Sequence, residues 1–255
     1  MKKAKKIIIT SVILTGIVFL FIPEVSPNNY QIEEILKDAA NADVVIVFNS
    51  GGWGNTPLER AEDFQSIISG IQTTLNEWGY KSIVIPYNRT KESFLGRLTG
   101  ARDFLTSFNN SSEDFSEKID LIVEKLPDKK IIITGLSNGG TLINKAYDNI
   151  SQKVQDSIYA VSVGTPFWSK KSQSDNILQV NNGGKDVLSE GNIGSLLLAF
   201  IKTPFSWVFS KIKSQNLKFS EAFHAPGHNY SWDSPEVGPE IVTFLEKKFV
   251  NYEKN

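Results

Sequence analysis

Lys130-Ile-Ile-Ile-Thr-Gly-Leu-Ser-Asn-Gly-Gly-Thr-Leu142 is the stretch of this sequence that most constrains its fold. Its first five residues predict a buried strand, and the residues from Gly139 onward predict a helix that begins at once. Between them, residues 135–139 fit the pattern G-x-S-x-G, a sharp strand-to-helix turn that holds a serine hydroxyl at the carboxyl edge of a sheet. Glycines two residues either side of the serine let neighbouring backbones approach closely. We therefore expect Ser137 to be a nucleophile; an ordinary Gly-Ser turn is the alternative.

Around this stretch, apolar runs of strand length alternate with amphipathic runs of helix length. This alternation predicts an α/β fold with a mostly parallel central sheet of about six strands and helices on both faces. Runs such as VVIVF (44–48) are continuously apolar, as expected of strands covered on both faces. The expected strands are 43–48, 81–86, 130–134, 157–163, 176–181 and 217–223. The clearest expected helices are 57–78, 113–126, 139–150, 193–212 and 235–250.

The composition of the chain limits which classes of function are expected. The chain has 255 residues, of which 40% are hydrophobic and 22% charged, so it can bury the core of one ordinary domain. The charges of its 27 basic and 28 acidic residues nearly cancel, so the net charge gives no reason to expect nucleic acid as a partner. The absence of cysteine and the presence of only two histidines exclude a thiolate metal site and make a zinc site improbable. No metal or organic cofactor is expected.

The first 23 residues indicate where the protein is located. Lys2, Lys3, Lys5 and Lys6 precede an uncharged, mostly apolar run over 7–23, whose length lies between a signal-peptide core and a membrane-spanning helix. Because no A-x-A cleavage pattern follows, an uncleaved single-pass anchor is favoured over a removed signal peptide. Basic residues stay cytoplasmic, so the rest of the chain is expected outside the membrane, and secreted if the segment is cut. Residues 24–29 are interpreted as a tether and 30–255 as one folded domain.

From residue 30 onward the sequence resembles the α/β-hydrolase superfamily, and in particular its bacterial lipase- and esterase-like serine hydrolases. The strand, serine pattern and helix at 130–142 carry this resemblance. It implies the hydrolase fold without the first two strands of its sheet, and a catalytic serine, acid and histidine in that order along the chain. The implied reaction is cleavage of a carboxylic ester through an acyl-enzyme.

Only His224 and His228 are available as the catalytic base. Residues 226–237 (PGHNYSWDSPEV), followed by a helix, resemble the histidine loop of lipase- and esterase-like members, which favours His228. A loop position also suits an imidazole that must take up and return a proton. His224 lies nearer the end of the last expected strand, where a structural role is expected.

The acid is expected after the next-to-last strand, 176–181. Asp186 follows that strand and is the first candidate, with Glu190 second. Asp175 is third because it precedes the strand and so lies at the wrong end of the sheet. The alternative for Asp186 is an ordinary turn, since Gly-Gly-Lys-Asp is also common without catalytic duty.

Two loops are candidates for contact with the substrate. Residues 49–54 (NSGGWG) follow the first core strand and resemble the His-Gly-Gly-Gly-Trp loop of some esterases, with Asn-Ser in place of His-Gly. That resemblance implies oxyanion donors, named here as the backbone N–H groups of Gly52 and Asn138, with Gly51 and Trp53 as alternatives. The expected acyl pocket is lined by Trp53, Phe167 and Trp168, although packing against a helix explains these aromatics equally well. The apolar segment 193–212 is a core helix or a lid.

Three functions remain open from the sequence. An esterase or lipase acting on a small-molecule or lipid ester is favoured by the apolar loops and the anchor. The same triad also serves a peptidase or a thioesterase. A non-catalytic binding domain that uses Trp53, Trp168 and Trp207 for recognition is the alternative from another class.

Overall fold

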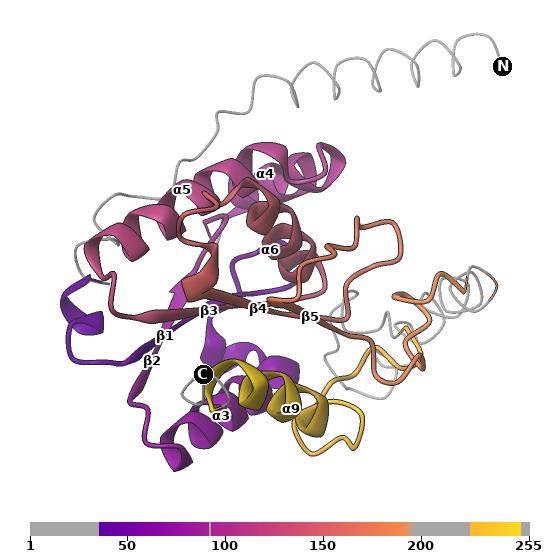
Figure 1. Cartoon of the computed structure of the whole chain (residues 1–255). Helices are drawn as coiled ribbons and strands as arrows, with labels where there is room; N and C mark the ends of the chain where they lie inside the picture. Colours follow the sequence, from indigo (N-terminus) through magenta and orange to yellow (C-terminus); the bar gives the residue numbers. More distant parts are fainter. Residues whose placement is uncertain (1–35, 92, 193, 195–224, 251–255) are drawn as a thin grey trace, which may run out of the picture.

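A five-stranded parallel sheet lies at the centre of the computed structural model, which describes residues 36–91, 93–192, 194 and 225–250 (Figure 1). Its spatial order is β2-β1-β3-β4-β5, and all four pairs of neighbouring strands are parallel. The strands are β1 (Val44–Asn49), β2 (Ser82–Tyr87), β3 (Lys130–Leu136), β4 (Ile158–Val163) and β5 (Ile177–Val180). Because the strands are parallel, their carboxyl ends meet at one edge, where the loops that follow them gather.

Helices cover both faces of this sheet. Figure 1 shows α4 (Phe94–Leu105), α5 (Asn109–Lys125) and α6 (Asn138–Asn149) on one face, with α3 (Glu62–Glu77) and α9 (Gly238–Phe249) on the other. Two short 3-10 helices, η1 (Leu58–Arg60) and η2 (Gln155–Ser157), precede α3 and β4. The sheet is therefore the middle of three layers, as predicted from the sequence.

The core is divided in two by the sheet, and β1 contributes to both halves. Every residue of β1 is buried, as the continuous apolar run predicts. Val45 and Val47 belong to the cluster on the α5 and α6 side, which includes Phe115 and Ile143. Val44, Ile46 and Phe48 belong to the other cluster, with residues of α3 and α9. Successive side chains of a strand point to opposite faces, so one strand supports both layers.

Five of the six expected strands are confirmed to within about two residues, while the sixth, 217–223, lies outside the described residues, as does the expected helix 193–212. The helix expected over 57–78 is interrupted at Ala61, and the last helix begins at Gly238 rather than residue 235. The helix α4 was not predicted from the sequence, because its two glycines weaken the pattern. Ser93 begins it by accepting a hydrogen bond from the Gly96 N–H at 3.0 Å.

The segments expected to anchor and tether the domain, 1–23 and 24–29, lie outside the described residues. Within the described part of the chain, no helix combines the length and the apolar character needed to cross a bilayer.

Candidate active site

Ser137 occupies the turn between β3 and α6, in a backbone conformation that is rare for a residue with a side chain. Its φ is 52° and its ψ is −115°, so the turn is strained. The Ser137 N–H donates to the Val163 carbonyl at 2.8 Å, which ties the turn to the end of β4. Such strain persists only where the surrounding structure enforces it, and it is typical of functional sites.

The two glycines of the serine pattern are explained by close approaches of the backbone. A Cβ on Gly135 would lie 2.7 Å from the Gly140 nitrogen, inside the turn itself. A Cβ on Gly139 would overlap the Asn49 carbonyl oxygen and lie 2.8 Å from that of Ser50. Because Gly139 lets α6 pack directly on the loop after β1, that loop is held beside Ser137.

Replacing Gly139 with alanine is expected to destabilise the protein and impair the site. Alanine favours a helix over glycine by about 1 kcal/mol, whereas overpacking a tight site costs about 1–3 kcal/mol. Here the obstructing atoms are backbone oxygens that no side-chain rotation can move, so we expect a net loss of about 1–2 kcal/mol. Urea denaturation of Gly139→Ala, compared with the exposed control Asn149→Ala on the same helix, measures it. Equal stability of the two variants would contradict the close packing.

Asp186 and His228 are brought together, as the sequence predicts. His228 Nδ1 lies 2.8 Å from Asp186 Oδ2. The carboxylate side chain is fully buried, and the imidazole is 22% exposed. A buried carboxylate on Nδ1 fixes the orientation and tautomer of an imidazole, which leaves Nε2 free for a reacting group.

The Asp186 carboxylate accepts further hydrogen bonds from residues that were not predicted. Tyr230 donates its hydroxyl to Oδ2 at 2.5 Å and Ser189 donates at 2.8 Å, while the Leu188 N–H donates to Oδ1 at 2.9 Å. Burial raises the pKa of Asp186, but the hydrogen bond and charge of His228, with those of Tyr230 and Ser189, outweigh it and lower the pKa to about 2. Asp186 is therefore ionised at any pH at which the site is expected to work.

Ser189 and Tyr230 lie close in the sequence to the acid and the base that they contact, but such short spacings are too common to have identified them. Ser189 stands three residues after Asp186, a spacing that suits an aspartate accepting hydrogen bonds from its own turn. Tyr230 stands two residues after His228, and its ring meets the imidazole edge-on with centroids 5.7 Å apart. Burial first, and then the hydrogen bond to Asp186, raise the pKa of Tyr230, so its phenol remains a donor.

The acid and histidine loops are joined through their backbones. The Val187 N–H donates to the Pro226 carbonyl at 3.1 Å, and Asn182 Nδ2 donates to the Gly227 carbonyl at 3.0 Å. Gly227 has a φ of 76°, and a Cβ there would lie 2.9 Å from the Asp186 nitrogen. A glycine is required at this position because the two loops approach so closely.

Ser137 and His228 both lie near the short segment Val163-Gly164. The Val163 carbonyl accepts from the Ser137 N–H, and a Cβ on Gly164 would lie 3.0 Å from His228 Cε1. The imidazole therefore reaches the carboxyl edge of the sheet at the strand next to the serine turn. Ser137 and His228 thus both lie near the carboxyl end of β4, and no hydrogen bond joins the Ser137 hydroxyl to the imidazole among the described residues.

In the described part of the chain, neither alternative acid forms a hydrogen bond with the His228 imidazole, and the alternative base lies outside that part. The Glu190 carboxylate accepts from Asn181 Nδ2 at 2.7 Å and is exposed. Asp175 precedes β5, at the opposite end of the strand from Asp186. His224 lies outside the described residues.

The loop after β1, which carries the expected oxyanion donors, passes next to the serine. A Cβ on Gly51 would lie 3.6 Å from Ser137 Cβ, which makes Gly51 the nearer of the loop glycines. The Gly52 carbonyl accepts from Asn138 Nδ2 at 3.2 Å, so the first residue of α6 also holds the loop. Among the described residues, no acceptor lies within hydrogen-bonding distance of the Gly51, Gly52 or Trp53 N–H.

The aromatic residues expected to line an acyl pocket are exposed on the surface. Trp53 is 46% exposed and Trp168 is 51% exposed. Phe167 packs edge-on against Trp168 at 5.0 Å between ring centroids, and Trp168 packs in the same way against Phe104 of α4 at 6.2 Å. Exposed large aromatics in contact with one another are typical of binding surfaces.

Comparison with known proteins finds similarity to one family of esterases. Residues 77–184 match the family model described as cutinase, a span that includes Ser137 and ends before Asp186. No curated protein matches the chain. Among solved structures, a Trichoderma reesei cutinase in complex with a C11Y4 phosphonate inhibitor is 20% identical, with 63% of this chain and 75% of that one covered and a TM-score of 0.44. A cutinase-like protein from Cryptococcus sp. is 16% identical, with 49% and 54% covered and a TM-score of 0.35.

Proposed function

We propose that this protein is a serine hydrolase that cleaves carboxylic esters, with Ser137 as nucleophile, His228 as general base and Asp186 as the acid that orients it. The observation that carries the proposal is the 2.8 Å hydrogen bond between His228 and the buried Asp186 carboxylate. Asp186 follows β5 and Ser137 follows β3, so both come after carboxyl ends of parallel strands. The match of residues 77–184 to the cutinase family model supports an ester as the substrate. No metal or organic cofactor takes part in the proposed reaction.

In the proposed mechanism, His228 Nε2 takes the proton of the Ser137 hydroxyl as the oxygen attacks the ester carbonyl carbon. The tetrahedral intermediate collapses, the carbon–oxygen bond to the alcohol breaks, and the imidazolium returns its proton to the departing alcohol. Water then attacks the acyl-enzyme, with His228 taking one of its protons. When the second tetrahedral intermediate collapses, that proton goes to Ser137 and the carboxylic acid leaves.

The developing negative oxygen needs hydrogen-bond donors that are already in place. The N–H groups of Gly51, Gly52 and Trp53 have no acceptor among the described residues, and the loop that carries them lies beside Ser137. The first N–H groups of a helix also lack intrahelical acceptors, and Asn138 begins α6. The sequence names Gly52 as the first loop donor, but Gly51 lies nearer to Ser137, so we propose that Asn138 and Gly51 donate to the oxyanion, with Trp53 and Gly52 as the alternative donors in the loop.

The acyl group is proposed to be apolar. Trp53, Phe167 and Trp168 expose aromatic surface on loops at the carboxyl edge of the sheet, and burying such surface against an acyl chain contributes about 25 cal/mol per Å². An apolar substrate also fits the proposed location outside a membrane, where the N-terminal segment 1–23 would hold the domain near lipid.

A panel of p-nitrophenyl esters of increasing acyl length, set against matched p-nitroanilide amides, tests the proposed bond and acyl group. We expect hydrolysis of the esters, with kcat/KM rising from the acetate to medium-length chains, and little cleavage of the anilides. Cleavage of anilides alone would replace the esterase with a peptidase. Absence of both activities, together with binding of apolar ligands, would favour a non-catalytic domain.

Truncating Trp168 is expected to weaken the preference for longer acyl chains. Removal of one large exposed aromatic from a binding surface costs about 1–2 kcal/mol, so kcat/KM for a medium-length ester should fall roughly 10-fold in Trp168→Ala. Activity on the acetate should change by less than about twofold, because an acetyl group has little apolar surface to bury against the ring. Val250→Ala, at an exposed apolar residue at the end of α9, is the control. An equal loss on both esters would contradict the assignment.

A further inference from the structure

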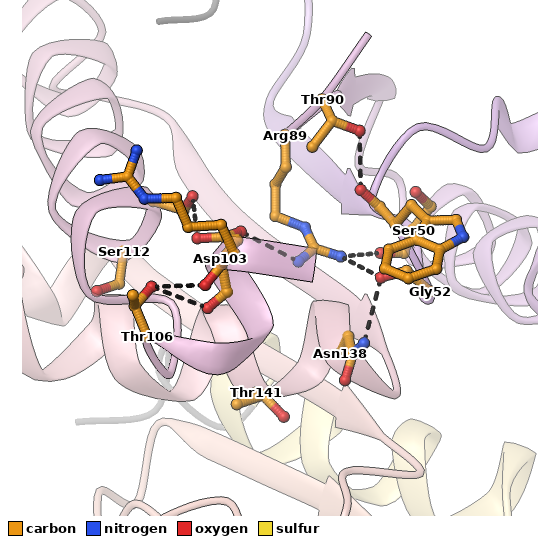
Figure 2. A network of polar contacts seen from close by, with 12 residues as sticks. Ser50, Gly52, Arg89, Thr90, Asp103, Thr106, Ser112, Asn138 and Thr141 are labelled. Atoms are coloured by element: carbon orange, nitrogen blue, oxygen red, sulfur yellow. Dashed lines mark hydrogen bonds and ion pairs between the residues drawn. The ribbon is translucent and has the colours of Figure 1, made fainter. Parts of the chain in front are cut away.

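Arg89 is a charged side chain that the proposed reaction does not use, although it is buried next to the site. Its side chain is only 1% exposed. Figure 2 shows its guanidinium pointing at the loop after β1, where Nη2 donates to the Ser50 carbonyl at 3.1 Å and to the Gly52 carbonyl at 3.2 Å. A Cβ on Gly54 would lie 2.7 Å from the guanidinium carbon, so the loop packs against the charge itself.

All five carbonyls of residues 50–54 accept hydrogen bonds, and most of the donors come from two residues. Besides the two bonds from Arg89 Nη2, Thr90 donates its hydroxyl to the Trp53 carbonyl at 2.9 Å and the Arg89 N–H donates to the Gly54 carbonyl at 2.8 Å. The Gly51 carbonyl accepts from the Gly54 N–H at 3.0 Å. The segment after β2 thus determines which way the peptide units of this loop face.

The orientation of the carbonyls sets the orientation of the N–H groups. In a trans peptide unit, the C=O of one residue and the N–H of the next point in opposite directions. Since Arg89 binds the Ser50 and Gly52 carbonyls, the N–H groups of Gly51 and Trp53 face away from it. Neither N–H group has an acceptor among the described residues. Both are therefore available to donate to an oxyanion, as an oxyanion hole requires.

The charge of Arg89 is balanced within the same cluster. Asp103 Oδ2 lies 3.6 Å from Arg89 Nη1, and Ser111 donates to Asp103 Oδ1 at 2.6 Å. The guanidinium carbon also lies 5.0 Å from the centroid of the Phe108 ring, which covers it from another side. Phe108 has a φ of 59°, a strained conformation that places this ring at the start of α5.

We propose that Arg89 is a positioning residue that fixes the peptide units of the loop after β1, so that their N–H groups are ready to bind the oxyanion of the ester reaction. The inference rests on the proposed function, because it assigns Arg89 a part in the same reaction. Arg89 touches neither the serine nor the substrate. Its effect is expected on kcat, since a preorganised donor acts on the transition state more than on the bound ester.

Arg89→Lys keeps the charge but removes the planar fork, which a single ammonium group does not reproduce. We expect its kcat for p-nitrophenyl butyrate to fall on the order of 10- to 100-fold, with KM changed less than about threefold. Arg60→Lys, at an exposed arginine in η1, is the matched control and should keep wild-type kinetics. A normal kcat in Arg89→Lys, or a change confined to KM, would overturn the proposal.

A second variant tests whether Arg89 positions the loop or only stabilises the fold through its ion pair with Asp103. Arg89→Met combined with Asp103→Leu removes both charges and leaves neither unpaired, a replacement that is often neutral for stability. The proposal expects this double variant to fold and to keep the low kcat, because the Ser50 and Gly52 carbonyls still lack the guanidinium. Recovery of wild-type kcat, or failure of both variants to fold, would instead assign Arg89 to stability alone.

Labelling of the wild type by a fluorophosphonate separates the two proposals. If the wild type is not labelled at Ser137 and hydrolyses no ester, the proposed function and this inference fail together. If it is labelled and active while Arg89→Lys matches it in kcat, only the inference about Arg89 fails.

Discussion

Ser137→Ala is expected to abolish both ester hydrolysis and covalent labelling by a fluorophosphonate. Without the hydroxyl no acyl-enzyme forms, and loss of the nucleophile of a triad lowers kcat by about 10⁴- to 10⁶-fold. Folding should be nearly unaffected, because the strained turn is held by the Ser137 N–H and by the flanking glycines rather than by the hydroxyl. Gel detection of the fluorophosphonate adduct, with the labelled peptide identified by mass spectrometry, measures the result.

Ser151→Ala is the matched control for this experiment, since Ser151 is an exposed serine just after the far end of α6. It should be labelled and should hydrolyse esters as the wild type does. Equal labelling of Ser137→Ala and the wild type would show that the reactive group is another residue. An unlabelled wild type would remove the serine mechanism altogether.

The layered fold was predictable because its signals are local. The continuous apolar runs at β1, β3 and β4 are buried on both faces, as their composition indicates, and the glycine spacing around Ser137 requires the turn that is seen. The helix α4 was not predictable in this way. Gly96 and Gly100 lower its intrinsic helical preference, yet tertiary packing favours them, since a Cβ on Gly100 would lie 3.1 Å from the Trp53 carbonyl oxygen.

The proximity of Asp186 to His228 was predicted from chain order, whereas their surroundings were not. Tyr230 and Ser189 complete the hydrogen bonds of the carboxylate, but tyrosine and serine are too common for a single sequence to mark them. Arg89 was missed for a different reason. Its role depends on the carbonyls of a loop about 35–40 residues earlier in the chain, and that contact exists only once β2 lies beside β1.

The Asp186→Asn variant is expected to lose about 10⁴-fold in kcat while it keeps its fold at neutral pH. An asparagine that presents its NH₂ group to Nδ1 forces the imidazole into the tautomer with a proton on Nε2, which then cannot accept the Ser137 proton. Glu190→Gln, which changes an exposed carboxylate bound to Asn181, is the control and should retain full activity. Comparable losses in the two variants would contradict the choice of Asp186.

Acid unfolding offers an independent check on the same carboxylate. Because the folded pKa of Asp186 is lowered to about 2, against about 3.9 in an unfolded chain, ionisation of Asp186 stabilises the folded state above about pH 4. That contribution, about 2 kcal/mol, is lost as the pH falls from about 4 to about 2. Asp186→Asn has no such carboxylate, so its free energy of unfolding in urea should fall less than that of the wild type over this interval. If the free energy of unfolding changed equally with pH in the two proteins, the folded structure would not favour the ionised form of Asp186. The hydrogen bonds that this carboxylate accepts from His228, Tyr230 and Ser189 would then have to be reassigned.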